Sequence, residues 1–178
     1  MAEAFSNKVA RASGIVTSTT GGAIGITTNL ITGISTVHVA VNDLVDTGNF
    51  ILGTKVTNIG VSSVTCDRDS TNDTAATSQT VKFLGPTTAY TSTGTKSILV
   101  GGTFANNTGN SVNLTVQIYD SSGTTEVGLA ANIPVPDGSS FVISDTGKTV
   151  LESSDELRVY CDTENAIDAT LSLLTGVS

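Results

Sequence analysis

The most constraining feature of this sequence is a period-two alternation of apolar and polar side chains between residues 97 and 177. In residues 112–119, valine, leucine and isoleucine occupy the even positions, and polar side chains or tyrosine occupy the odd ones. Residues 157–162 and 167–173 continue the same alternation. In a β-strand, this period sends one set of side chains to a core and the other set to solvent or a partner. Short alternating strands separated by turns predict an antiparallel sandwich or barrel.

Turn residues divide this half of the chain into short segments. Asparagine, aspartate, glycine and serine gather where the alternation stops, and these residue types are typical of tight turns. Gly101 and Gly102 lie inside an expected strand, where glycines indicate a bulge or a close backbone approach. No long helix is expected anywhere. Strands are predicted at residues 88–92, 97–105, 111–120, 127–133, 140–144, 156–162 and 166–174, with turns at 106–110, 121–123, 136–138 and 152–155.

Residues 13–85 are expected to form a separate small β-unit. Their strand signals are short and often interrupted, and a polar run covers residues 69–78. The Gly85-Pro86 pair is a turn or boundary signal at the end of this unit. The predicted strands are 23–27, 37–41, 55–59, 63–67 and 79–84, with turns marked by Asp43, Asp46, Gly48 and Asn49.

The first twelve residues are interpreted as a short arm. Phe5 and Val9 are its apolar positions, and we expect them to anchor it. Their spacing fits either one helical turn or an irregular strand, and both remain open. The arm is expected to dock either on a neighbouring subunit or on its own sandwich.

The composition is poor in charge, because 38% of the residues are apolar and only 13% are charged. The surface must therefore be built largely from threonine, serine, asparagine and glycine. Free cytosolic proteins normally keep themselves soluble with charged side chains, so this composition favours a chain that is packed among neighbours. Ordinary secreted β-proteins share it, and that alternative stays open.

The net charge of −8 and the pI of about 4.3 argue against two classes of partner. Nucleic-acid binders need a basic footprint, and an anionic membrane surface repels an acidic chain. No segment approaches the roughly 18 consecutive apolar residues that span a bilayer. The N-terminal region carries Glu3, Lys8 and Arg11 without an apolar core, so no signal peptide is predicted and folding in a cytoplasm is expected.

Cys66 and Cys161 lie far apart in the sequence, each at an apolar position of an expected strand. We expect both to be small buried hydrophobic side chains. A disulfide would need close Cα atoms and an oxidising compartment. The chain has no CxxC motif, so a zinc site has no support.

The order of strands and turns in the second half resembles a family of tailed-bacteriophage (cyanophage-like) virion structural proteins with a β-sandwich fold. Members typically open with a short arm like AFSNKV, which is residues 4–9 here. The chain departs from the family pattern at Thr93, where a proline is common. The segments that carry the resemblance are TTAYTSTGTKSILVGGTFANNTG, NLTVQIYD, ANIPVPDGSSFVI and LESSDELRVYCDTENAIDATLSLL.

The resemblance implies three segments. Residues 1–13 would be an N-terminal arm belonging to the sandwich, residues 14–85 an inserted small β-domain, and residues 86–178 the β-sandwich domain. The insert itself resembles another phage and surface-protein module, through GISTVHVAVNDLVDTGNFILGTKVTNIGVSSVTCDRDSTND and TVKFLG. The expected fold class is all-β, an antiparallel β-sandwich with a second small β-lobe inserted near the N-terminus.

Two groups of side chains in the insert are candidate chemical sites. His38 is the only histidine, and no GxSxG or HExxH motif accompanies it, so an exposed or capped strand histidine is expected. Asp67, Asp69, Asn72 and Asp73 could offer oxygen ligands to calcium, but the glycine and the later glutamate of an EF-hand are missing. We expect a polar loop whose side chains satisfy its own backbone. No metal ligand and no cofactor are predicted.

Asp155, Glu156, Glu164 and Asp168 could be the paired carboxylates of a glycosidase. That chemistry needs two carboxylates facing each other across a sugar-binding cleft, and such clefts are usually lined by aromatic rings. The chain has no Trp, three Tyr and five Phe. Asp155 is therefore interpreted as a turn residue before a strand, no catalytic residue is predicted, and the chain is not expected to be an enzyme.

The family resemblance implies a virion protein that is made in the host cytoplasm and exposed on the particle exterior. We favour a capsid-surface decoration or cement protein that stabilises the particle by surface burial. Its expected partners are other virion proteins, either the major capsid protein or tail and neck proteins, together with further copies of itself. A tail, neck or fibre-associated protein is the alternative. A carbohydrate-binding module is a third hypothesis, for which Tyr119 and Tyr160 lie in outward phase.

Overall fold

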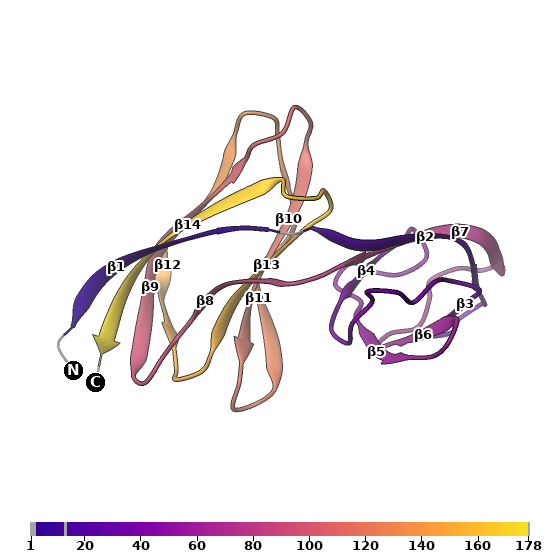
Figure 1. The fold of residues 1–178 in the computed structure, drawn as a ribbon, viewed down its shortest axis with the longest axis horizontal. Helices are drawn as coiled ribbons and strands as arrows, with labels where there is room; N and C mark the ends of the chain where they lie inside the picture. The colour runs from indigo at the N-terminus through magenta and orange to yellow at the C-terminus, as the bar shows by residue number, and fades with distance from the viewer. Residues whose placement is uncertain (1–2, 13, 178) are drawn as a thin grey trace. The chain divides into compact units, whose positions relative to one another are not determined.

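The computed structural model describes residues 3–12 and 14–177, and these residues form strands joined by turns and loops (Figure 1). The predicted all-β class is confirmed. Among the described residues, no helix has the length and hydrophobicity needed to cross a membrane. The chain divides into two compact units. One is Gly14–Gly85, where the sequence analysis places the insert, and the other takes in the chain before Gly14 and from Pro86 onward.

The larger unit is a sandwich of two four-stranded antiparallel sheets, in the orders β1-β14-β9-β12 and β11-β10-β13-β8. Counted from one to eight along the chain, the strands read 1-8-3-6 in the first sheet and 5-4-7-2 in the second, which is a jelly-roll order. The strands are β1 (Ala4–Arg11), β8 (Thr87–Thr91), β9 (Lys96–Asn106), β10 (Val112–Asp120), β11 (Thr125–Val135), β12 (Ser140–Leu151), β13 (Glu156–Cys161) and β14 (Ile167–Val177).

The inner faces of the two sheets share one hydrophobic core. Phe104 of β9 and Leu171 of β14 are fully buried in the first sheet, as are Leu114 of β10 and Leu157 of β13 in the second. These residues belong to the apolar phase of the period-two pattern. Two sheets bury that phase by packing face to face, which contributes about 1.5–3 kcal/mol for each large apolar side chain.

Strand β9 contains the bulge that its glycines predict, and Gly102 also lies close to a neighbouring side chain. The partners of β14 step from Gly101 to Leu99, so Val100 is the extra residue. A Cβ atom on Gly102 would lie 3.1 Å from Cδ2 of Leu171, which leaves little room for a side chain. The bulge shifts the inward positions from odd to even numbers, and Leu99 and Phe104 therefore both reach the core.

The smaller unit is a six-stranded antiparallel sheet, in the order β4-β7-β2-β3-β6-β5, that closes on itself. The two outer strands meet at the Leu44–Lys55 bridge and through the amide of Val45, which donates to the Thr54 carbonyl at 2.8 Å. The closed sheet surrounds its own apolar core, which includes the fully buried Phe83. The strands are β2 (Ile15–Ile24), β3 (Leu30–Thr32), β4 (Leu44–Asp46), β5 (Val56–Ile59), β6 (Ser63–Cys66) and β7 (Ala76–Leu84).

Several strand predictions in the smaller unit are wrong. The expected strand 37–41 is a pair of turns, in which His38 has a φ of 66° and Asn42 a φ of 75°, both outside the β region of backbone conformations. Strand β2 begins at Ile15 rather than at residue 23, and its run of threonines and serine hid it. Strands β3 and β4 were not predicted, since three residues are too few to show a period, and Asp46 ends β4 instead of marking a turn.

The N-terminal arm is a regular strand of the sandwich. β1 pairs with β14 along its whole length, from Ala4 opposite Thr175 to Arg11 opposite Asp168. Phe5 and Val9 do not anchor the arm on its own sandwich, because they are 80% and 77% exposed, and docking of the arm on a neighbouring subunit stays a prediction. Small side chains take that role instead, namely the partly buried Ala10 and the fully buried Ala12.

The two ends of the smaller unit meet. The amide of Gly85 donates to the carbonyl of Gly14 at 3.2 Å, so the first and last residues of this unit are neighbours. Replacing residues 14–85 by a short Gly-Ser linker should therefore leave a folded sandwich, because β1 keeps its full ladder with β14. Circular dichroism should show a β-spectrum and one cooperative thermal transition. A molten or insoluble product would show that the sandwich depends on its insert.

Candidate functional site

The outward side of the β1-β14-β9-β12 sheet, called the outer face below, carries a line of apolar side chains. Directly paired residues of antiparallel strands point to the same side of a sheet. Phe5 pairs with Leu174, Leu174 with Ile98, and Ile98 with Val150, which we call the apolar row. Each strand supplies one member. The bulge residue Val100, 46% exposed, adds to this apolar surface.

The remainder of the outer face is nearly uncharged. Each end carries one ion pair, Arg11 with Asp168 and Lys96 with Glu152, so the charges of these four side chains cancel. Between them lie two further rows, Asn7-Ser172-Gly101-Ser144 and Val9-Thr170-Thr103-Val142. Exposed, contiguous apolar surface on a soluble protein marks an interaction site more often than it serves stability. The outer face is therefore the main candidate interface.

The Arg11–Asp168 pair joins the first and last strands of the sandwich. Nη2 of Arg11 donates to Oδ2 of Asp168 at 3.0 Å, and Nδ2 of Asn107 donates to the same oxygen at 3.1 Å. These hydrogen bonds, with that of Arg11 the larger, hold the pKa of Asp168 below its ordinary value. Both side chains are largely exposed, so the pair adds little to stability.

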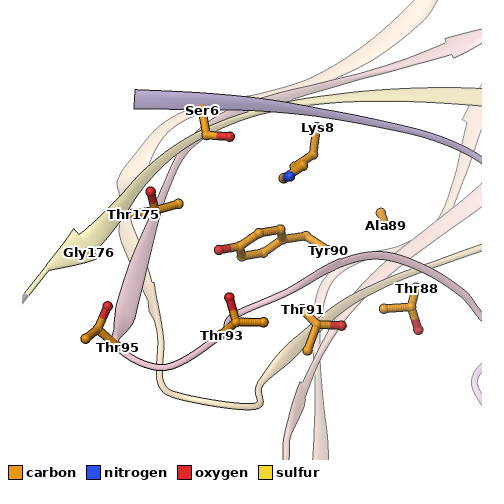
Figure 2. A pocket seen from close by; sticks show the side chains of 10 residues that line it. All are labelled: Ser6, Lys8, Thr88, Ala89, Tyr90, Thr91, Thr93, Thr95, Thr175 and Gly176. Carbon is orange, nitrogen blue, oxygen red and sulfur yellow. The ribbon is translucent and has the colours of Figure 1, made fainter. Parts of the chain in front are cut away.

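A polar cleft of about 500 Å³ lies between β1 and β8, which are edge strands of opposite sheets. Figure 2 shows Ser6 and Lys8 of β1 on one side and threonines of β8 and the following loop on the other, with the Tyr90 ring between them. The Tyr90 hydroxyl is already engaged, 2.7 Å from the Ser97 hydroxyl. The cleft is completed by Thr88, Ala89, Thr91, Thr93, Thr95, Thr175 and Gly176.

The chemistry of this cleft is that of a hydrogen-bonding groove. Its lining offers hydroxyl groups and the ammonium group of Lys8, which can hold a polar or anionic group by hydrogen bonds. The cleft is not visible in the sequence, because the segments that form its two sides are separated along the chain by the whole inserted unit. Nothing in either segment alone indicates that Lys8 and Tyr90 lie together.

The smaller unit presents apolar surface of its own. A shallow hollow of about 330 Å³ includes Ile24, Leu30 and Ala76 in its lining, and its walls are mainly apolar. Other apolar side chains of this unit are strongly exposed, with Val61 at 99%. The exposed set is Ile26, Leu30, Val37, Val41, Ile51, Leu52 and Val61.

The other sheet of the sandwich holds a largely buried charged cluster. Arg158 of β13 bonds to Glu126 and to Glu156, each at 2.8 Å. Its guanidinium carbon lies 4.0 Å from the centre of the Tyr119 ring, a cation–π contact. The side chains of Arg158 and Glu126 are 15% and 3% exposed, so this cluster is a structural element and not an open site.

The aromatic candidates for sugar stacking are not available as expected. Tyr160 is fully buried, although it alternates with core residues and lies in outward phase. The Tyr119 ring is stacked against Arg158. The prediction that both rings are open to a ligand is therefore wrong for Tyr160, and for Tyr119 the guanidinium already occupies the ring.

Side chains of the polar loop after β6 bond mainly to the backbone of other segments, and the contact expected within the loop is made by Nδ2 of Asn72, which donates to the Thr74 carbonyl at 3.2 Å. Oδ1 of Asp67 accepts from the Lys55 amide at 2.8 Å, and Nδ2 of Asn72 donates to the Gly25 carbonyl at 3.2 Å. Asp69 and Asp73 are exposed. No cluster of three acidic, histidine or cysteine side chains suited to a metal occurs among the described residues. His38 is exposed on its turn.

The four carboxylates weighed as a catalytic pair have separate structural roles. Asp155 is buried and accepts from the amides of Ser121 and Glu152, as a turn residue does. Glu156 belongs to the Arg158 cluster and Asp168 to the Arg11 pair. Glu164 is exposed in the β13–β14 turn.

Comparison of the chain with protein-family models, with curated proteins and with solved structures finds no match in any of the three.

The two arginine–carboxylate pairs allow a direct comparison of what a buried and an exposed ion pair contribute to the free energy of unfolding. Arg158→Leu should destabilise the protein by about 3–5 kcal/mol, because it leaves the buried Glu126 carboxylate without its cation. Arg11→Leu, at an exposed pair, should cost no more than about 1 kcal/mol. Urea unfolding of both variants measures the difference. Equal losses would mean that the Arg158 cluster is screened by solvent.

The two cysteines should be unreactive in the folded protein. Both are buried and free, as predicted. Burial, with a smaller contribution from Asp67, raises the pKa of Cys66 to about 12, and burial also raises the pKa of Cys161. Because the thiolate is the reactive form, a thiol reagent at pH 8 should modify neither residue until denaturant is added. Rapid reaction of either thiol without denaturant would show that its strand opens locally.

Proposed function

We propose that this protein is a structural component of a tailed-phage virion, acting as a capsid-surface decoration or cement protein. The similarity of its strand and turn order to tailed-phage virion proteins supports membership of the particle. The jelly roll supports it further, since viral capsid proteins use this fold, as do lectins. A fold alone does not define a function, and the exposed surfaces of the protein are more informative.

The observation that carries the proposal is exposed apolar surface on both units. The sandwich presents the apolar row, and the smaller unit presents its own apolar hollow and exposed side chains. A protein that joins parts of a particle must contact at least two neighbours. One exposed surface would suit a simple dimer, whereas two suit a connecting role.

The mechanism is surface burial repeated at many sites. A standard interface buries about 1,600 Å², and a protein that binds only the assembled particle stabilises that state by mass action. Salt screens charges over about 8–10 Å. Because the charged side chains at the two ends of the outer face form ion pairs, attachment should not depend on low salt.

A tail, neck or fibre-associated role is the second candidate. The polar cleft between β1 and β8 favours it, because a groove of hydroxyl groups with one cation suits a polar ligand on a host surface. The carbohydrate-binding hypothesis loses support from the burial of Tyr160 and the stacking of Tyr119. It now depends on the cleft alone.

Particles stripped of this protein provide the test. If it acts as a cement, stripped particles should lose genome at a lower temperature, and added purified protein should restore the original temperature, also in moderate salt. Release of the packaged nucleic acid, followed by a fluorescent dye during heating, measures this. Particles that stay equally heat-resistant but no longer adsorb to host cells would contradict the cement role and favour the tail or fibre role.

A further inference from the structure

We propose that the outer face is a self-association surface, on which a second copy of this chain packs face to face about a two-fold axis parallel to the strands. The proposal goes beyond the virion role and concerns the isolated protein. Its basis is the chemistry of the rows on the outer face. Two kinds of two-fold axis in the plane of the interface bring one sheet against another, one parallel to the strands and one perpendicular to them.

With the axis parallel to the strands and between β14 and β9, each row meets its own counterpart. The strand order reverses across the interface, so Phe5 faces Val150 of the second copy and Leu174 faces Ile98. The whole apolar row is then covered by the same row of the other copy. The outer face is chemically self-complementary in this arrangement.

Charges also favour this axis. Arg11 would face the neutral row position Ser140 of the second copy, and Asp168 would face Ala105. The one approach of like charges is at a corner, between Glu3 and Glu152, and Lys96 already pairs with Glu152 at 2.9 Å. Two chains of net charge −8 repel each other, so they can meet closely only through such a neutral surface.

The other axis, perpendicular to the strands, is disfavoured. Placed midway between the Asn7 and Val9 rows, where the two faces overlap fully, it keeps each strand opposite itself but reverses the rows, so that Phe5 would face Arg11 and Leu174 would face Asp168. An ion pair that is now largely exposed would be buried against apolar side chains. Removing such a pair from water costs more than the contact returns.

The area predicts a weak dimer. Four strands spaced by about 4.8 Å, over roughly 25 Å of length, give on the order of 500 Å² for each copy. The total of about 1,000 Å² is at the lower limit for a specific interface. We therefore expect a dimer that forms at high protein concentration and tightens as salt screens the repulsion between the two acidic chains.

Sedimentation equilibrium of the full-length protein over a wide concentration range tests the surface. Ile98→Lys should weaken the dimer by about tenfold or more, because it places a charge against the apolar row of the second copy. Val127→Lys is the matched control, since Val127 is an exposed valine of β11 in the other sheet. It should leave the dimer unchanged. A wild-type protein that stays monomeric throughout, or a dimer insensitive to Ile98→Lys, overturns the proposal.

Cross-linking tests the axis. Protein carrying Phe5→Cys, mixed with protein carrying Val150→Cys, should form a disulfide-linked dimer under mild oxidation, since the native cysteines are buried. Each protein carries only one of the two new cysteines, so the bond can form only between two chains. Within one chain the two positions lie about three strand spacings, roughly 14 Å, apart, which is too far for a disulfide. Cross-linking of Phe5→Cys with Arg11→Cys instead would establish the perpendicular axis and overturn the proposed one.

Discussion

β14 is the strand on which the first sheet of the sandwich depends. β14 lies between β1 and β9, with an unbroken antiparallel ladder to β1 and a ladder to β9 that the bulge at Val100 interrupts. On its inner side, Leu171 and Leu173 are buried in the core, so β14 serves both as a backbone template and as core material. β1 contributes little apolar burial of its own. Its place therefore depends mainly on hydrogen bonds from β14.

Because hydrogen bonds from β14 hold β1 in place, the outward side chains of β1 are not needed to keep it there. A strand held by its backbone does not need its outward side chains for stability, and yet Phe5 and Val9 are large and apolar. The core is complete without them. Because exposed apolar groups carry a solubility cost and here give no internal stabilisation, a contact outside the chain is the physical reason for them that the structure supports. The nearly cancelled charges of the outer face point the same way.

The sequence predicts the strands of the sandwich well and their arrangement poorly. Residues 112–119 and 167–173 alternate strictly because each strand buries one face, and that signal is local. The jelly-roll order depends on which strands pair at long range, and no local pattern encodes that. In the smaller unit the signal fails, since β3 and β4 are only three residues long and β2 is rich in threonine. Tyr160 shows a further limit, because phase predicts the side of a sheet but not what covers it.

The candidate interface could be predicted only in part. The apolar character of Phe5 and Val9 is visible in the sequence, but their partners Leu174, Ile98 and Val150 become a row only through the register. The bulge at Val100 sets that register, because it changes which residues of β9 face outward. A pair of glycines indicates the bulge, but not which residue it displaces.

The ladder between β1 and β14 also sets an order of events during synthesis. Arg11 and its partner Asp168 are 157 residues apart, so at ordinary translation rates β1 leaves the ribosome on the order of ten seconds before its partner exists. The closed sheet of the smaller unit needs only residues 14–85 and can fold during that interval. The N-terminal segment, with Phe5 and Val9, must wait unpaired beside an already folded module. Pairing of the first strand with the last therefore comes after the smaller unit has had time to fold.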